Sequence, residues 1–139
     1  MDLHRFIDAQ AGDYAAALAE IRAGRKRSHW MWYIFPQIQG LGYSETSRRY
    51  AIRDASEAKA YLAHPLLGAR LREISGALLA LPSCDAGAVM GYPDDLKLKS
   101  CMTLFFLVSG EPVFQRVLDK FFGGETDPKT VAILGRADS

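Results

Sequence analysis

Three consecutive cations stand close before both tryptophans of this chain. Arg25, Lys26 and Arg27 lead into an aromatic run that begins at Trp30. A guanidinium fork matches the oxygens of a phosphate, and an aromatic face stacks on a base or an adenine ring. We therefore predict that residues 24–37, the basic-aromatic segment, bind a small anionic, nucleotide-like ligand. In the alternative interpretation, the cations form a solvated loop and the aromatic residues pack in the core.

Within this segment the residue types predict separate roles. Arg25 and Lys26 are expected to hold the anion as exposed cations, while Trp30 or Trp32 stacks on the ring. His29 is the expected catalytic residue, because an unperturbed imidazole titrates near pH 6.5, which is about the range of physiological proton transfer. A histidine that caps the following helical turn is the alternative, so binding with and without catalysis both fit the segment.

A second polar cluster lies near residue 94. Asp94, Lys97 and Ser100 are spaced i, i+3 and i+6, which places them on one face of a helix. The Asp94 carboxylate is a candidate general base. The alternative is a helix N-terminus with an i, i+3 ion pair. We predict that the basic-aromatic segment and the helix of Asp94 converge in space, because only their meeting brings cation, stacking surface and acid-base group into one cleft.

The positive charge of the chain is concentrated in one region. Net charge is only +1, yet residues 21–53 carry seven Lys or Arg and a single acid, Glu45. Anionic ligands are the natural partners of such a local field. A second hypothesis follows: Arg48, Arg49 and Arg53 join the cations of the basic-aromatic segment in one flat face. The protein is then a non-catalytic interaction module for nucleic acid or a protein partner.

Length and composition describe an ordinary globular protein. The 139 residues, 49% of them hydrophobic, suffice for one domain with its own core. The polar N-terminus and the lack of a long apolar run predict a cytoplasmic protein without signal peptide or membrane span. Two cysteines, Cys84 and Cys101, are expected to be free thiols. The three histidines are far apart and no CxxC pair occurs, so we expect neither a metal site nor a cofactor.

Hydrophobic spacing and capping residues predict an all-α fold of about eight short helices over residues 1–139. The pattern starts a helix at residues 2–10, breaks it at Gly12 and caps a new one at Asp13. Further N-caps are expected at Ser44, whose helix runs to Ile52, and at Asp85 and Asp127. Another is expected at Asp54, where Glu57 three residues later gives the reciprocal capping pattern. The predicted core residues are Leu71, Ile74, Leu78, Met102, Phe105, Val117 and Leu118.

Several motifs resemble one known family. They are residues 24–37, Gly40-Leu41-Gly42-Tyr43-Ser44, Tyr50-Ala51-Ile52, residues 60–71 and the pattern D-x-x-K-x-x-S-x-M-T-L-F from Asp94 to Phe105. Together they resemble the bacterial domain-of-unknown-function family 1810, sometimes labelled "calpastatin", whose members are small, single-domain and mainly helical. The resemblance implies a site at Arg25, Lys26, Ser28, His29, Trp30, Trp32, Pro36, Gln37, Asp94, Lys97, Ser100 and Thr103. Cys101 stands where serine is more usual. The chain is also loosely similar to the NADAR family, but it lacks that family's glutamate-histidine-tyrosine motif.

Overall fold

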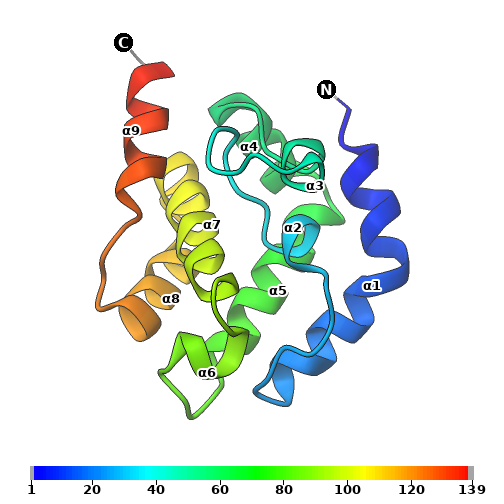
Figure 1. The fold of residues 1–139 in the computed structure, drawn as a ribbon, viewed down its shortest axis with the longest axis vertical. Helices are drawn as coiled ribbons and strands as arrows, with labels where there is room; N and C mark the ends of the chain where they lie inside the picture. Colours follow the sequence, from blue (N-terminus) through cyan, green and yellow to red (C-terminus); the bar gives the residue numbers. More distant parts are fainter. Residues whose placement is uncertain (1, 138–139) are drawn as a thin grey trace.

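The computed structural model describes residues 2–137, which form helices joined by loops (Figure 1). In chain order the helices are α1 (His4–Arg22), α2 (Met31–Ile34), α3 (Glu45–Arg49), α4 (Ala55–Ala63), α5 (Leu67–Leu79), α6 (Ala86–Met90), α7 (Asp94–Ser109), α8 (Pro112–Phe122) and α9 (Pro128–Ala137). Across these described residues, strand pairing is limited to an isolated bridge between Ile38 and Ile52. The predicted all-α fold is therefore confirmed.

Helix α1 is longer than its sequence pattern indicates. The predicted break at Gly12 and the predicted N-cap at Asp13 are both wrong, because the helix runs through this point without interruption. One internal glycine costs a helix only about 1 kcal/mol, which packing can offset. The Asp13 carboxylate instead accepts a hydrogen bond from the Tyr33 hydroxyl at the other side of the α1–α2 contact.

Helix α7 lies at the centre of the molecule and packs against α4, α6, α8 and α9 (Figure 1). Its sequence predicts one apolar stripe through Leu98, Cys101, Met102 and Phe105. In the structure the whole stretch 100–105 is buried, because neighbouring helices cover the helix on several sides. All the predicted core residues are buried as well. The polar first turns of α7 remain at the surface, where they take part in the site.

Most of the predicted N-caps are confirmed. The side chains of Ser44, Asp54 and Asp85 each accept a hydrogen bond from the backbone N–H three residues later. Helix α3 nevertheless ends before Ile52, which the sequence pattern includes in it. The Ile52 backbone pairs with the loop after α2 instead: its N–H donates to Gln37 at 2.8 Å and its carbonyl accepts from Gln39 at 2.7 Å.

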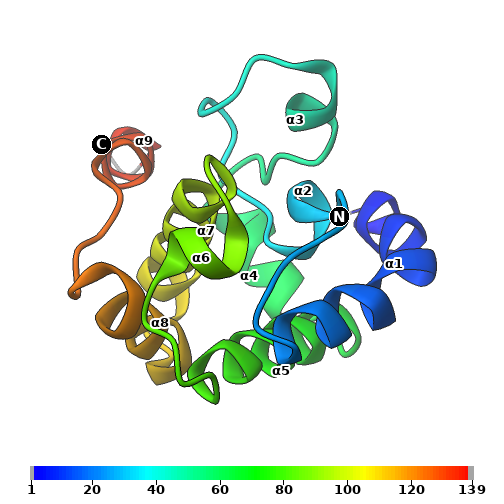
Figure 2. The ribbon, with the colours of Figure 1, turned by 60° about the horizontal axis from the view of Figure 1, so that its bottom comes forward.

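This pairing fixes the loop between α2 and α3, which lies outside the packed helices on the same side as α9 (Figure 2). The loop also packs tightly against α3. A Cβ at Gly42 would lie 2.6 Å from the Ser47 hydroxyl oxygen and 2.8 Å from its Cβ, so no other residue fits without a shift. The segment from Gln37 to Tyr43, here the α2–α3 loop, is thus anchored at both ends.

The structure also tests the expectations about membrane spans and cysteines. Among the described residues, no helix has the length and apolar character needed to cross a membrane. Both cysteines are free thiols, as predicted: Cys84 is exposed, whereas Cys101 is buried in α7. Burial raises the pKa of the Cys101 thiol well above its usual value, so this thiol stays protonated and behaves as a core side chain.

Candidate functional site

The basic end of the basic-aromatic segment is held against α1 by one carboxylate. Glu20 accepts hydrogen bonds from the backbone N–H of Arg27 at 2.6 Å and of Ser28 at 2.8 Å. The Ser28 hydroxyl and the Trp30 indole N–H also donate to it, at 2.7 and 3.1 Å. Ser28, a predicted ligand-binding residue, is thereby engaged in holding the segment in place.

These contacts shift the titration of Glu20. Desolvation raises the pKa of its carboxyl group, but the hydrogen bonds from Ser28, Arg27 and Trp30 favour the ionised form and outweigh it, so the pKa falls from 4.5 to about 2. Because the folded-state pKa is depressed, the stabilisation is complete above about pH 4.5. It is lost as the pH falls toward 2, where the carboxylate takes up a proton.

We expect Glu20→Gln to lower the free energy of unfolding at pH 7 by about 1–2 kcal/mol, the value of hydrogen bonds to a partly exposed charged group. The difference from the wild type should shrink between pH 4.5 and 2, where the wild-type carboxylate is itself neutralised. Urea unfolding at several pH values measures both effects. Glu45→Gln, at an exposed glutamate, is the control. A difference that stays constant over this pH range would contradict the role of Glu20.

Helix α7 and the basic-aromatic segment meet at Asp94, and the predicted convergence is confirmed. Lys26 Nζ lies 2.9 Å from one oxygen of the Asp94 carboxylate, and Lys97 Nζ lies 3.1 Å from the other. The Lys26 backbone N–H also donates to Val89 of α6 at 2.7 Å. Residues about seventy positions apart in the chain therefore share one ionic cluster.

The burial of this cluster corrects the role expected for Lys26. Its side chain is only 7% exposed, and its ammonium binds Asp94 and the Ser28 carbonyl and lies 4.9 Å from the Trp30 ring centroid. Lys26 is therefore a structural cation rather than an exposed anion ligand. Trp30 is 1% exposed, so its ring is part of the core and offers no face for stacking.

The same cluster decides the charge of Asp94. Partial burial raises the pKa of its carboxyl group, but the hydrogen bonds and charges of Lys26 and Lys97 outweigh this and hold the pKa below its usual value. The carboxylate is thus ionised and engaged on both oxygens. Two ammonium groups that stabilise the ionised form make it a weaker proton acceptor. The geometry favours a role for Asp94 in positioning Lys97.

Lys97 connects this cluster to an open groove on the surface. Its ammonium lies 3.9 Å from the centroid of the Trp32 ring, within the range of a cation–π contact. The lining of this groove, the Trp32–Lys97 groove, includes Trp32, Gln37, Leu41, Gly42, Leu96, Lys97, Lys99, Ser100, Asp127 and Lys129. Four predicted ligand-binding residues therefore come together: Trp32, Gln37, Lys97 and Ser100.

The far wall of the groove is formed where α9 begins. The Asp127 carboxylate accepts hydrogen bonds from the backbone N–H of Thr130 at 3.1 Å and from its hydroxyl at 2.6 Å, which confirms the predicted cap. The Ser100 hydroxyl lies 3.1 Å from the same carboxylate, and the Asp127 backbone N–H donates to the Thr103 hydroxyl at 2.9 Å. Ser100 and Thr103 thus dock α9 onto α7.

The sequence did not predict that the start of α9 lines the groove. The Asp127-Pro128 pair signalled a helix start, but no local pattern placed that start beside α7. For the same reason the sequence did not identify Lys99 and Lys129 as site residues, although both line the groove. Lys99 also forms an ion pair of 3.6 Å with the exposed Glu125.

The remaining predicted site residues lie elsewhere. Arg25 and His29 are exposed, and neither lines the Trp32–Lys97 groove. His64, by contrast, caps a helix: its Nδ1 accepts hydrogen bonds from the backbone N–H of Leu66 and Leu67, both at 3.2 Å. Within residues 2–137, no group of three or more His, Cys, Asp or Glu side chains is arranged to hold a metal ion.

Known proteins match both the sequence and the fold of this chain. Residues 1–134 match a family described as "Protein of unknown function (DUF1810)". The crystal structure of the conserved hypothetical protein Rv1873 from Mycobacterium tuberculosis is similar, with a TM-score of 0.95 and 47% sequence identity over 96% of each chain. No curated protein matches the chain. The family resemblance of the sequence motifs is thereby confirmed.

Proposed function

We propose that this chain, which belongs to the DUF1810 family of proteins of unknown function, binds a small anionic, nucleotide-like ligand in the Trp32–Lys97 groove. The observation that carries the proposal is the Lys97 ammonium 3.9 Å from the Trp32 ring centroid. Gln37 and Ser100 line the same groove. A stacking surface, a cation and hydrogen-bonding groups therefore share one concave surface, which is what such a ligand requires.

The charges along the groove favour an anion. Lys97, Lys99 and Lys129 line it, and among the described residues of the lining the carboxylate is Asp127. That carboxylate is already used by the hydrogen bonds that cap α9. Asp94 and Glu125 pair with Lys97 and Lys99 from outside this lining. The lysine ammonium groups can rotate toward a phosphate or carboxylate of the ligand, while the half-buried Trp32 side chain supports its ring.

The geometry supports binding more directly than catalysis. His29 lies outside the lining of the groove, and Asp94 is held between two ammonium groups. We therefore assign binding to the groove and propose no proton-transfer step for either residue.

The alternative, an interaction module with a flat basic face, requires the cations of the basic-aromatic segment to join Arg48, Arg49 and Arg53. Those three arginines line a hollow on another part of the surface, and Arg25 and Arg27 are not part of its lining. The sequence pI of about 7.8 is also below the value above about 9 that is typical of nucleic-acid-binding domains. Both observations favour the small-ligand proposal.

A ligand screen by thermal shift and calorimetry tests the proposal, with AMP, ADP-ribose and the uncharged adenosine as probes. We expect a phosphorylated probe at one hundred times its Kd to stabilise the wild type by about 2.7 kcal/mol. Trp32→Ala should weaken binding by about 1–3 kcal/mol, the value of one base–aromatic stack. Lys97→Ala should weaken the binding of the phosphorylated probes more than the binding of adenosine, because it removes a positive charge.

Lys59→Ala is the matched control, since Lys59 is an exposed lysine on α4 outside the groove. It should leave the affinity for each probe unchanged. If no probe binds, or if Trp32→Ala and Lys97→Ala bind as tightly as Lys59→Ala, the Trp32–Lys97 groove is not the site.

A further inference from the structure

A second hollow, separate from the Trp32–Lys97 groove, is lined by four arginines. Arg5 comes from α1, Arg48 and Arg49 from α3, and Arg53 from the segment that follows α3. Parts of the α2–α3 loop form another wall, so the loop stands between the two concave surfaces. We refer to this surface as the arginine hollow.

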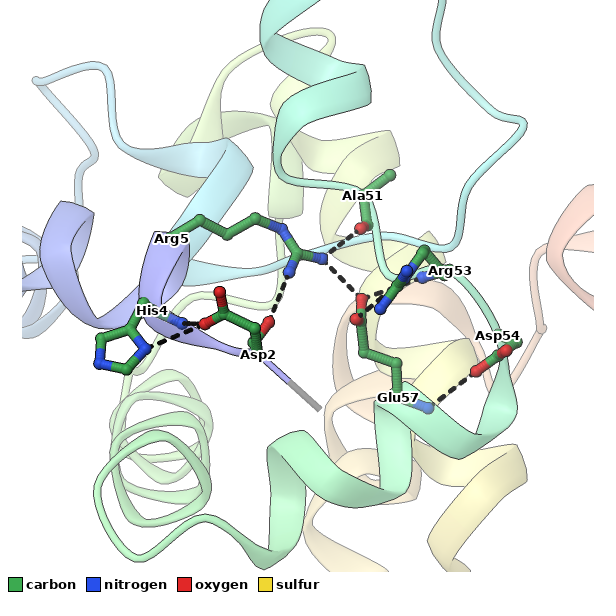
Figure 3. A network of polar contacts seen from close by, with 7 residues as sticks. All are labelled: Asp2, His4, Arg5, Ala51, Arg53, Asp54 and Glu57. Carbon is green, nitrogen blue, oxygen red and sulfur yellow. Dashed lines mark hydrogen bonds and ion pairs between the residues drawn. The ribbon is translucent and has the colours of Figure 1, made fainter.

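A buried carboxylate beneath the hollow positions two of these arginines (Figure 3). Glu57 is fully buried, and its carboxylate accepts hydrogen bonds from Arg5 Nη2 at 2.6 Å and from Arg53 Nε at 3.3 Å. Arg5 Nη2 also donates to the Ala51 carbonyl at 2.8 Å, and Nη1 donates to the Asp2 carbonyl at 3.1 Å. The Arg5 guanidinium is therefore held in one orientation.

The charges of this arrangement do not balance. Four guanidinium groups line the arginine hollow, and among the described residues of its lining the carboxylate is Asp2. The network of Figure 3 adds the carboxylates of Glu57 and Asp54. The arginines therefore still outnumber these carboxylates. Arg53 meets Glu57 through Nε, and its side chain is 64% exposed, so its terminal nitrogens are available to a further partner. Arg48 and Arg49 are exposed as well.

We propose that the arginine hollow is a second binding site, which takes the phosphate group of a small phosphorylated molecule. Guanidinium groups that converge from several elements match the tetrahedral oxygens of one phosphate, and the pre-oriented Arg5 loses little freedom on binding. The excess of positive charge favours a phosphate monoester, which carries between one and two negative charges at pH 7. This inference does not rest on the function proposed for the Trp32–Lys97 groove.

A single phosphate fits the arrangement better than a nucleic-acid strand. A strand is bound by cations that follow its backbone along a groove or stripe. Here the cations converge on one hollow, and the chain as a whole carries a net charge of only +1. The ligand expected is therefore compact, with its charge at one end.

Calorimetric titration with inorganic pyrophosphate tests the site, because the probe carries phosphate chemistry without a ring to stack on Trp32. We expect saturable binding of one pyrophosphate per chain. The double variant Arg48→Ala/Arg49→Ala should raise the Kd about tenfold or more, since it removes two charge-assisted contacts. Both side chains are exposed, so the variant should keep the wild-type melting temperature within about 2 °C.

Arg22→Ala/Arg116→Ala is the matched control, because it removes the same charge from exposed positions on α1 and α8 outside the hollow. Its Kd for pyrophosphate should equal that of the wild type. Lys97→Ala, which removes a cation of the Trp32–Lys97 groove, should also bind pyrophosphate normally. The two proposals can therefore fail independently. The site is overturned if pyrophosphate does not saturate, or if the control loses as much affinity as Arg48→Ala/Arg49→Ala. It is also overturned if a single-stranded oligonucleotide binds more tightly than pyrophosphate, since the hollow is then part of a nucleic-acid face.

Discussion

Replacing Glu57 with alanine is expected to lower the free energy of unfolding by about 3–5 kcal/mol, the cost of removing one partner of a buried ion pair. Glu57 is fully buried and accepts hydrogen bonds from Arg5, from Arg53 and from the Arg53 backbone N–H at 3.1 Å (Figure 3). Without the carboxylate, the partly buried Arg5 guanidinium loses its counter-ion. Urea unfolding of the two proteins at pH 7 measures the difference.

Glu45→Ala is the control, because this glutamate is exposed and lies at the start of the neighbouring helix α3. It should change stability by less than about 0.5 kcal/mol, as surface substitutions usually do. A double-mutant cycle that combines Glu57→Ala with Arg5→Ala measures the interaction free energy between these two side chains. If the two substitutions are additive, Arg5 and Glu57 do not stabilise the fold as a pair.

Phe105→Ala is expected to cost about 3–5 kcal/mol, the usual range for truncation of a buried aromatic residue. Phe105 is completely buried in the central helix α7. Its ring centroid lies 5.4 Å from that of Tyr61 on α4 and 6.0 Å from that of Phe114 on α8. The alanine variant therefore leaves a cavity at the junction of three helices. Thermal and urea unfolding followed by circular dichroism measure the loss.

Leu107→Ala is the matched control for this prediction, since Leu107 lies two positions further along α7 and is 45% exposed. Truncation there removes little buried surface and should cost less than about 1 kcal/mol. Equal losses in the two variants would mean that the cavity does not cause the effect, since alanine favours the helix at both positions.

The local features of the fold could be predicted from the sequence. Apolar spacing identified core residues such as Leu71 and Phe105, because a helix that buries one face must repeat apolar residues every three to four positions. Capping residues such as Ser44 and Asp54 marked helix starts, because their side chains satisfy backbone N–H groups only three residues away. Both signals depend on neighbours in the chain.

The candidate site was predicted only in part. Its residue types drew attention to Trp32 and Lys97, which the fold does bring together at 3.9 Å. The same residue types predicted that Lys26 is an exposed cation and that the Trp30 ring offers a face on which a ligand can stack. Both are buried, since packing of the segment against α1, α6 and α7 decides which side of each residue meets solvent.

Glu57 shows the division between sequence and tertiary structure. The sequence determined that Asp54 starts a helix and that Glu57, three residues later, is placed to reach back toward its N-terminus. The folded chain confirms the Asp54 cap but turns the Glu57 carboxylate to the Arg53 backbone and to Arg5, 52 residues away. A cap depends on local geometry, whereas a buried ion pair depends on which elements pack together. For that reason the sequence alone determined most of the helix starts and the predicted core residues, and the tertiary structure alone decided where the charges of this protein converge.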